Sequence, residues 1–301
     1  MAFKRILYFS LGILLLTACR GTTQAPQETA DRLPNLQFAD AESLREAFVW
    51  KSDNPALISA HRGGPEAGFP ENCLETFENT IGYAPSILEM DVVQSSDGVL
   101  YLMHDNSLDR TTNGTGKVSD QPWSYVETLK LIDNDGAATN FEVPTLMETL
   151  AWGRGKAILS LDVKRGVPFE QVVAEVEEAK AESYIMVIVY NLKDAQKVHN
   201  LNPRLMMSVS IRNQEELDRF KATGIPSTQI VAFTGTRLKE ARFYKQLHDE
   251  GISCILGTLG NLDKQAAARG DELYLQHRDL GVDIFATDRP AAVAKVLYGT
   301  K

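Results

Sequence analysis

The chain has 301 residues, of which 44% are hydrophobic and 24% are charged, so it is long enough to bury a sizeable core in one large domain or two small ones. Its 40 acidic and 31 basic side chains give a formal net charge of −9 at pH 7. The sequence has no basic patch or stripe of the kind that binds nucleic acid, so we expect no nucleic-acid partner, and no protein partner is evident. An acidic balance of this size does not imply a positively charged substrate.

The first segment, residues 1–19, has the pattern of an export signal. Lys4 and Arg5 precede a mostly apolar run at 6–16, which is shorter than the roughly 20 residues that span a bilayer and is typical of a signal peptide. Cys19 follows small residues, an ending that resembles the bacterial lipoprotein box, in which cleavage leaves the cysteine as the lipid-carrying first residue. We therefore expect a lipidated Cys19 that anchors the chain to a membrane of the bacterial cell envelope, facing the periplasm or the exterior. An ordinary signal peptide is the alternative.

Residues 20–39 are rich in Thr, Gln, Ala and Pro and have no apolar period, which predicts a disordered tether. Asp40 has the chemistry of an N-cap, and Leu44 and Phe48 follow at helical spacing, so a helix is expected there at the start of one domain over 40–301.

Two further cysteines, Cys73 and Cys254, lie in this domain. Export permits a disulfide between them, but Cys254 lies in an apolar run and Cys73 lies in or near a loop. Buried free thiols are therefore the favoured interpretation.

From residue 56 onward, short apolar runs alternate with helical patterns. The runs span 57–60, 86–93, 157–163, 185–190, 205–211, 228–233, 252–257 and 283–287, and the helical patterns span 74–83, 145–152, 168–182, 192–200, 213–223, 237–250 and 263–280. Runs rich in Ile, Val, Leu and Met are typical of strands buried on both faces. This alternation predicts an α/β fold with a parallel sheet, and eight repeats predict a closed (β/α)8 TIM barrel. An open doubly wound sheet is the alternative, although it lacks the Gly-x-Gly-x-x-Gly signature of its dinucleotide-binding form.

One segment departs from the alternation just after the second run. Asp97-Gly98 separates two strand-like runs, and so short a link cannot make a parallel crossover. Asp-Gly is typical of a hairpin, so residues 99–103 are predicted to be an antiparallel return arm and not a barrel strand. Residues 104–144 then form an insertion before the helix at 145, and long insertions in compact domains are usually functional.

Polar residues gather at the ends of the early strands, where the active sites of barrels lie. They are His61 and Arg62 after the first run, Glu89 and Asp91 in the second, His104 after the hairpin, and Asp162 and Lys164 at the third. Residues two apart on a strand share a face, so the two carboxylates of the second strand point the same way. We expect all of these side chains to meet at the mouth of the barrel.

The chemistry of this set favours cleavage of a phosphate diester. Three carboxylates in one small site raise one another's pKa values, and a single divalent cation, Ca²⁺ or Mg²⁺, relieves this by taking their oxygens as ligands. Arg62 and Lys164 are then suited to bind a phosphate. The histidines His61 and His104 can act as general base and general acid, while metal and cations neutralise the charge that builds on the phosphate oxygens.

Eight short motifs follow one another along residues 56–290. They are HRG at 61–63, PEN at 70–72, EMD at 89–91, SSDGVLYLMHD at 95–105, SLDRTTNGTG at 107–116, VPTLMETL at 143–150, LDVK at 161–164 and GVDIFATDRP at 281–290. In this order they resemble the glycerophosphodiester phosphodiesterases, which share a barrel with phosphoinositide-specific phospholipases C. The resemblance implies a metal-dependent hydrolase that releases glycerol 3-phosphate and an alcohol from deacylated phospholipids. It also implies roles: His61 and His104 as the acid/base pair, Glu89, Asp91 and Asp162 as metal ligands, Arg62 and Lys164 as phosphate-binding residues, and Glu71 and Asn72 as supporting residues.

Three positions depart from the pattern of that family. Asp162 stands where the family usually has Glu, and its side chain reaches about 1.5 Å less, roughly one carbon–carbon bond, which bears on metal affinity or identity. Cys73 replaces the Thr of PENT. Gly257-Thr258-Leu259-Gly260 replaces a Trp-Thr-Val-Asn-like motif, so an apolar wall for the substrate is expected to be lost and the bound head group to be larger or different.

Two other functions stay open at this point. A phospholipase C/D-like enzyme would cleave the head group of an intact lipid, which a membrane anchor would bring within reach, although no apolar lid or aromatic-rich loop stands out in the sequence. A non-catalytic surface lipoprotein would bind a phosphate ligand on an inherited barrel. The remaining histidines, His199, His248 and His277, are predicted to have surface or packing roles.

Overall fold

The structure, a computed structural model, describes residue 1 and residues 34–300. Nearly all of the predicted export signal, its Cys19, and residues 20–33 of the predicted tether lie outside the described residues. Among the helices of 34–300, none combines the length and the apolar composition that crossing a membrane requires.

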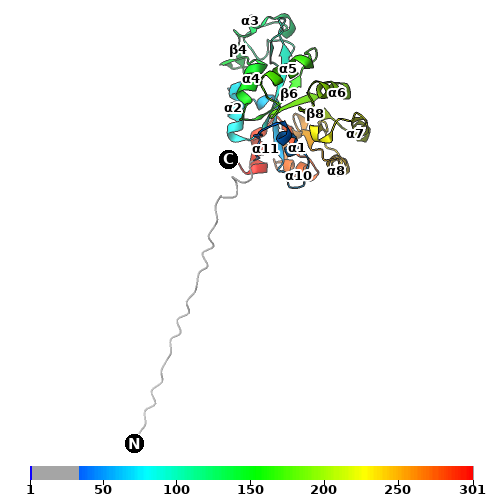
Figure 1. Cartoon of the computed structure of the whole chain (residues 1–301). Helices are drawn as coiled ribbons and strands as arrows, with labels where there is room; N and C mark the ends of the chain where they lie inside the picture. The colour runs from blue at the N-terminus through cyan, green and yellow to red at the C-terminus, as the bar shows by residue number, and fades with distance from the viewer. Residues whose placement is uncertain (2–33, 301) are drawn as a thin grey trace.

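A closed barrel of parallel strands forms the body of the protein (Figure 1). The strands are β1 (Leu57–Ala60), β2 (Ile87–Gln94), β6 (Ile158–Val163), β7 (Ile185–Val189), β8 (Met206–Ser210), β9 (Ile230–Phe233), β10 (Cys254–Gly257) and β11 (Ile284–Thr287). They pair in this order, and β11 pairs back with β1 to close the barrel. Each predicted apolar run coincides with one of these strands, and β2 extends one residue beyond its run, so the TIM barrel is confirmed and the open sheet is wrong.

Helices follow the strands around the outside of the barrel, and α6, α7 and α8 line one side of it (Figure 1). The α-helices are α1 (Ala41–Phe48), α2 (Leu74–Tyr83), α3 (Trp123–Val126), α4 (Leu146–Gly153), α5 (Phe169–Glu178), α6 (Leu192–Leu201), α7 (Gln214–Lys221), α8 (Ala241–Asp249), α9 (Asn261–Arg269), α10 (Leu273–Asp279) and α11 (Pro290–Tyr298), and the 3₁₀ turns are η2 (His61–Gly63), η3 (Val118–Asp120) and η4 (Ser227–Gln229). Several begin at polar caps: Thr145 forms a capping box with Glu148, and Asn191 and Asn213 accept backbone N–H groups of α6 and α7.

One helix prediction was wrong. The helical pattern at 263–280 is two helices, α9 and α10, because Gly270 ends the first with a φ of 115°. That left-handed conformation suits glycine and stops the helix, which periodicity alone does not reveal.

The hairpin and the insertion after β2 are confirmed. β3 (Leu100–Leu102) runs antiparallel to the end of β2, with Val93 opposite Tyr101. Beyond it, β4 (Lys130–Ile132) and β5 (Ala138–Glu142) form a separate two-stranded sheet. The insertion has its own apolar core, in which the buried Tyr101 packs with Trp123 at a ring distance of 5.6 Å. In Figure 1 its α3 and β4 lie at the end of the barrel domain opposite α10.

The end of the barrel where the strands begin is closed by residues 34–48, which we call the floor. Leu44 and Phe48 of α1 are buried against the first residues of the strands, such as Ile87 and Ile158. Asp40 caps α1, as predicted, by accepting the backbone N–H of Ser43. Leu36 is also buried in this cluster, so the predicted tether ends earlier than residue 39.

Candidate active site

Six of the predicted site residues line one cavity at the end of the barrel where the strands stop. The cavity has a volume of about 280 Å³ and is lined by His61, Glu89, Asp91, His104, Asp162 and Lys164, among others. The barrel register explains this convergence. Asp91 on β2 stands directly beside Asp162 on β6, and Glu89 lies two residues earlier on the same strand face.

The three carboxylates form a compact acidic group. One oxygen each of Glu89, Asp91 and Asp162 lies within 4.8 Å of the others. Burial and the charge of Asp91 together raise the pKa of Glu89 well above its ordinary value of 4.5. Lys164 lies between two of them, with its Nζ 2.6 Å from Asp91 and 2.7 Å from Asp162. With all three carboxylates ionised, one lysine would leave the group with an excess of two negative charges.

This donor set fits a hard divalent cation. Asp162 Oδ1 is buried and, among the residues that the structure describes, has no hydrogen-bond partner. An orphaned carboxylate oxygen beside two others is the kind of ligand that Ca²⁺ or Mg²⁺ takes. Although its side chain is shorter than that of Glu, Asp162 still brings a carboxylate oxygen close to those of Glu89 and Asp91.

His61, at the end of β1, is held by a carboxylate from the last strand. Its Nδ1 lies 2.7 Å from Oδ1 of Asp288, which follows β11. Burial acts to lower the pKa of His61, but the hydrogen bond to Asp288 and the charge of Glu89 outweigh it and hold the pKa above its ordinary value of 6.5. A ring fixed through Nδ1 keeps Nε2 available for a proton transfer.

His104, which follows β3, is held in the same way by its neighbour. Its Nδ1 lies 2.8 Å from Oδ1 of Asp105. Arg110 in turn binds Asp105 through Nε and Nη2, at 2.6 and 3.0 Å, and binds Glu71 through Nη1 and Nη2, at 2.9 and 2.8 Å. The hydrogen bond from Arg110 holds the pKa of Asp105 far below its ordinary value of 3.8, so this carboxylate stays charged.

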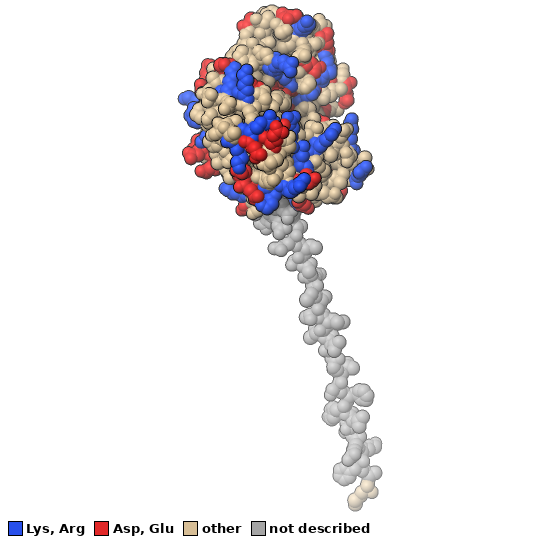
Figure 2. Space-filling view, turned by 90° about the vertical axis from the view of Figure 1, so that its right-hand side faces the viewer, with Lys and Arg blue, Asp and Glu red and all other residues tan. Residues whose placement is uncertain are grey.

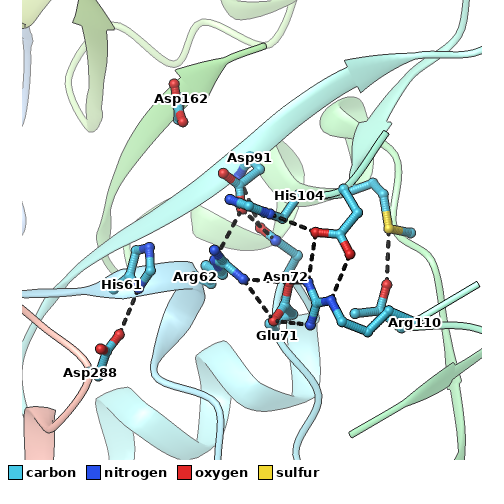
Figure 3. A network of polar contacts seen from close by, with 12 residues as sticks. His61, Arg62, Glu71, Asn72, Asp91, His104, Arg110, Asp162 and Asp288 are labelled. Atoms are coloured by element: carbon cyan, nitrogen blue, oxygen red, sulfur yellow. Dashed lines mark hydrogen bonds and ion pairs between the residues drawn. The ribbon is translucent and has the colours of Figure 1, made fainter. Parts of the chain in front are cut away.

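The loop after β1 connects these two histidines to the acidic group (Figure 3). Arg62 donates its backbone N–H to Glu89 and its Nη1 to Glu71 at 3.0 Å. Asn72 donates its side-chain amide to Asp91 at 2.7 Å and accepts the Asp91 backbone N–H at 2.9 Å. Both Arg62 and Asn72 adopt left-handed backbone conformations, with φ of 51° and 56°. Such backbone is costly for residues other than glycine and is found where a loop must hold a fixed geometry.

The structure therefore places the predicted residues in two layers. Lys164 lines the cavity beside the carboxylates, whereas the guanidinium of Arg62 is turned toward Glu71, which is only 3% exposed (Figure 3). Glu71 and Asn72 lie behind the cavity and support it, one through the arginines and the other through Asp91.

Three participants were missed by the sequence reasoning: Asp105, Arg110 and Asp288. The signal for Asp288 was its position directly after the last apolar run, at the same kind of strand end as the predicted site residues. The signal for Asp105 was its place beside His104. Arg110 belongs to a motif quoted above for the family resemblance, but nothing in its spacing shows that it would reach back to Glu71.

The side of the cavity away from the histidines is neutral. It is formed by residues at the ends of β7 to β10, including Tyr190, Ser208, Ser210, Phe233, Thr236 and Leu259. A side chain at Gly257 would bring its Cβ within 3.0 Å of Thr236 and 3.2 Å of Phe233. Phe233, Leu259 and Tyr190 thus supply apolar surface where the sequence predicted that a tryptophan wall was lost.

A second group, His248, Cys254 and Asp283, lies near the floor and has a structural explanation. Asp283 accepts the backbone N–H of Cys254 at 2.7 Å and lies 2.9 Å from His248 Nε2, and Trp50 stacks on His248. Burial raises the pKa of the Cys254 thiol, which makes it a poor metal ligand. Cys73 and Cys254 are free and buried, as predicted.

Fold and site together define the class: a TIM barrel with an acidic group, suited to a divalent cation, between two histidines that carboxylates hold. Residues 61–292 match the glycerophosphoryl diester phosphodiesterase family, and the chain belongs to that family.

Known proteins of this family agree with the assignment. A solved glycerophosphoryl diester phosphodiesterase from Parabacteroides distasonis is 36% identical, with a TM-score of 0.83 over 88% of this chain and 93% of that one. A phosphodiesterase structure from Oleispira antarctica, in complex with the product sn-glycerol-3-phosphate, is 19% identical with a TM-score of 0.63 over 80% of this chain and 96% of that one, a likeness of fold. Human glycerophosphodiester phosphodiesterase 1 is 34% identical over 119 residues, an alignment that covers 38% of this chain and only 36% of the human protein.

Proposed function

We propose that the protein hydrolyses glycerophosphodiesters to glycerol 3-phosphate and an alcohol. The observation that carries the proposal is the single cavity on which two histidines, three carboxylates and a lysine converge. Family membership supports it, as does the sn-glycerol-3-phosphate that the Oleispira antarctica structure contains as product. Against the non-catalytic alternative, both histidines, the three carboxylates and Lys164 line one cavity.

Glu89, Asp91 and Asp162 would hold one divalent cation, Ca²⁺ or Mg²⁺. When bound, this cation supplies positive charge against the non-bridging oxygens of the phosphate. Lys164, 24% exposed at the cavity wall, adds a second positive charge to the same oxygens. The backbone N–H of Arg62 fixes Glu89, and Asn72 fixes Asp91, so the ligands keep their orientation.

The two histidines would divide the proton transfers between them. His61, whose pKa is raised, is suited to give a proton from Nε2 to the departing alcohol oxygen. In the same step, His104 would take the proton of the attacking water as its oxygen bonds to phosphorus, with Asp105 stabilising the positive ring that results. Arg62, tied to Glu71, orients this arrangement and adds positive charge behind it.

The test is release of glycerol 3-phosphate from glycerophosphocholine, glycerophosphoethanolamine, glycerophosphoglycerol and glycerophosphoinositol, first in chelator and then with Ca²⁺ or Mg²⁺ restored. We expect release only with metal. Loss of a residue that only orients a metal ligand weakens metal binding by about 10- to 100-fold. Asp162→Asn removes a ligand itself, so it should weaken metal binding by more than that. Asp218→Asn, at an exposed position on α7, should change nothing. Release in excess chelator from the unaltered protein would overturn the metal-dependent mechanism.

Vesicles of intact phospholipid belong in the same panel. Head-group release from vesicles without turnover of any glycerophosphodiester would establish the phospholipase-like alternative. Tight binding of glycerophosphodiesters by folded protein, without turnover under any metal, would establish the non-catalytic one.

We also propose that Cys19 carries a lipid and anchors the protein in the bacterial cell envelope. The basic start, the short apolar run and the small residues before Cys19 support this proposal. Expression of the full chain with a labelled fatty acid should label the protein, and Cys19→Ser should abolish the label and release the protein from membranes. Equal labelling of the Cys19→Ser variant would refute the anchor.

A further inference from the structure

A second cavity adjoins the catalytic one at the ends of β7 and β8. It also has a volume of about 280 Å³, and it is lined by Asn191, Leu192, Arg212, Glu216 and Arg219 together with Tyr190 and Ser210. Tyr190 and Ser210 line the catalytic cavity as well, so the two spaces share a boundary. A molecule whose phosphate lies among the catalytic residues therefore has room to continue past Tyr190.

The charge of the second cavity differs from that of the wall it adjoins. The neighbouring wall of the catalytic cavity carries only neutral side chains, such as Ser208, Phe233 and Thr236. The residues that line the second cavity include two arginines and one glutamate; Glu215, 3.8 Å from Arg219, is mostly exposed and does not line it. A neutral passage that ends at arginines suits a ligand with a neutral middle and an anionic far end.

The two arginines are arranged differently. Arg212 is held by Glu216, which accepts from its Nη2 at 2.7 Å and from its Nε at 3.1 Å. Within residues 34–300, the one ion pair of Arg219 is with Glu215, at 3.8 Å, which is beyond hydrogen-bond length, and Glu215 is mostly exposed. The charge of Arg219 also helps to lower the pKa of Glu216. Arg212 is thus fixed in position by Glu216, whereas Arg219 has no hydrogen bond to a carboxylate of the described residues and can turn toward a ligand.

The local distribution of charge favours a discrete subsite over a broad basic surface. Figure 2, which faces the side of the molecule bearing α6, α7 and α8, shows cationic and anionic side chains interspersed across that side. Docking onto an anionic membrane surface would favour an extended basic field, which this face does not present.

We propose that Arg219 and Arg212 form a subsite for a second phosphate, so that the preferred substrates are glycerophosphodiesters whose alcohol itself carries another phosphate. This inference rests on the proposed function. The chemical class includes the deacylated form of a lipid with two phosphodiesters joined by a central glycerol, bis(glycerophospho)glycerol.

The experiment compares bis(glycerophospho)glycerol with glycerophosphoglycerol, since both offer the same kind of scissile bond and only the first carries another phosphate. For the full chain with metal, we expect the larger diester to have the higher kcat/KM after correction for its two equivalent diesters. Arg219→Gln should lower that preference about 10-fold, mainly through KM, because it removes a charge-assisted contact.

Two further variants keep the test clear of folding effects. Glu216→Gln removes the negative charge but keeps an acceptor for Arg212, so it should increase the preference for the larger diester. Arg278→Gln, at another exposed arginine that lies near the floor, should leave both substrates unchanged. An equal loss on both substrates in Arg219→Gln, or no preference in the unaltered protein, would overturn the subsite.

Inorganic phosphate distinguishes a substrate subsite from a site for a free anion. Added phosphate should raise the KM for bis(glycerophospho)glycerol more than the KM for glycerophosphoglycerol, and Arg219→Gln should remove this difference. A change in the rate of glycerophosphoglycerol alone that depends on Arg219 would instead indicate a separate anion site and contradict the proposal. The proposal would also be contradicted if Arg219→Gln weakened binding to anionic vesicles but left the preference between the two diesters unchanged. If neither diester is hydrolysed, the proposed function fails, and not this inference alone.

Discussion

At the scale of single residues, the two histidines differ in what surrounds them although each is held through Nδ1 by an aspartate. His61 faces Asp288 and the charge of Glu89, and its pKa is raised. Asp105, the partner of His104, is in turn neutralised by Arg110. The ring of His61 is therefore held by a carboxylate that has no arginine of residues 34–300 bound to it, whereas the ring of His104 is held by a carboxylate that Arg110 already neutralises. This difference is the basis for giving the acid role to His61.

Asp288→Asn tests that role through the pH dependence. Removing the carboxylate charge lowers the pKa of His61, so its protonated form is lost at a lower pH. The alkaline limb of the kcat/KM profile should therefore move toward lower pH. General acid catalysis contributes about 10²- to 10⁴-fold, so kcat near neutral pH should fall by at most that factor. An acidic limb that moves while the alkaline limb stays in place would assign His61 the role of base.

The sequence could predict six of the residues that line the cavity, because each lies near the end of a strand and these strand ends meet in one place. It could not predict their hydrogen-bond partners to the same extent. Asp288 lies 227 residues from His61, and that pairing exists only because β11 closes the barrel against β1. Arg62 likewise turns toward Glu71 from a left-handed backbone conformation, with a φ of 51°. Sequence alone rarely indicates that conformation for a residue other than glycine.

At the scale of elements, the insertion and the loop after β1 hold each other through one arginine. Arg110 lies in the insertion and makes bonds to Asp105 and to Glu71, which belongs to the loop. The insertion is thereby part of the site, in keeping with the expectation that a long insertion is functional.

Arg110→Gln should loosen His104 without removing a group that touches the substrate. We expect kcat to fall about 10- to 100-fold with little change in KM, as is usual when an outer partner is removed. Lys130→Gln, which breaks the exposed ion pair with Glu142 in the same insertion, is the matched control and should keep full activity. A large rise in KM in Arg110→Gln would mean that Arg110 binds the substrate directly.

The same variant has a predicted effect on stability against pH. Because Arg110 depresses the pKa of Asp105 below 3.8, the pair stabilises the fold at neutral pH, and this contribution is lost as the pH falls through the lowered pKa. The difference in the free energy of unfolding between the two proteins should therefore be largest near pH 7 and shrink in acid. Urea unfolding at several pH values measures it.

The loop after β1 depends on Gly63 as well. Its φ is 83°, and a Cβ there would lie 2.2 Å from the ring of the buried Phe77. Gly63→Ala should lower the free energy of unfolding by about 2–5 kcal/mol through strain and overpacking. Gly98→Ala has a similar φ of 97° but open space around its Cβ, so it should cost only about 1–2 kcal/mol. Equal losses would show that the ring of Phe77 moves aside.

At the scale of the whole molecule, the floor and the mouth occupy opposite ends of the barrel. Phe48 is 3% exposed in the floor cluster, far from the catalytic cavity. Phe48→Ala should lower the free energy of unfolding by about 3–5 kcal/mol while leaving kcat at 25 °C unchanged. The partly exposed Leu238→Ala is the control and should cost less than about 0.5 kcal/mol. A fall in kcat that matches the loss of stability would mean that the floor shapes the site.

The barrel itself was predictable because its strands are buried on both faces and repeat eight times, a pattern that few other folds share. The floor was only half predictable. The cap at Asp40 and the spacing of α1 are visible in the sequence, but the burial of Leu36 depends on a surface that eight separate strands create together.

Residue 34, where the continuous described run begins, lies in the floor at the closed end of the barrel. In the proposed anchored protein, the predicted disordered tether would join this closed end to the lipid at Cys19. A tether of that kind leaves the barrel free to turn, so the anchor would concentrate the enzyme at the membrane without fixing which way its mouth faces.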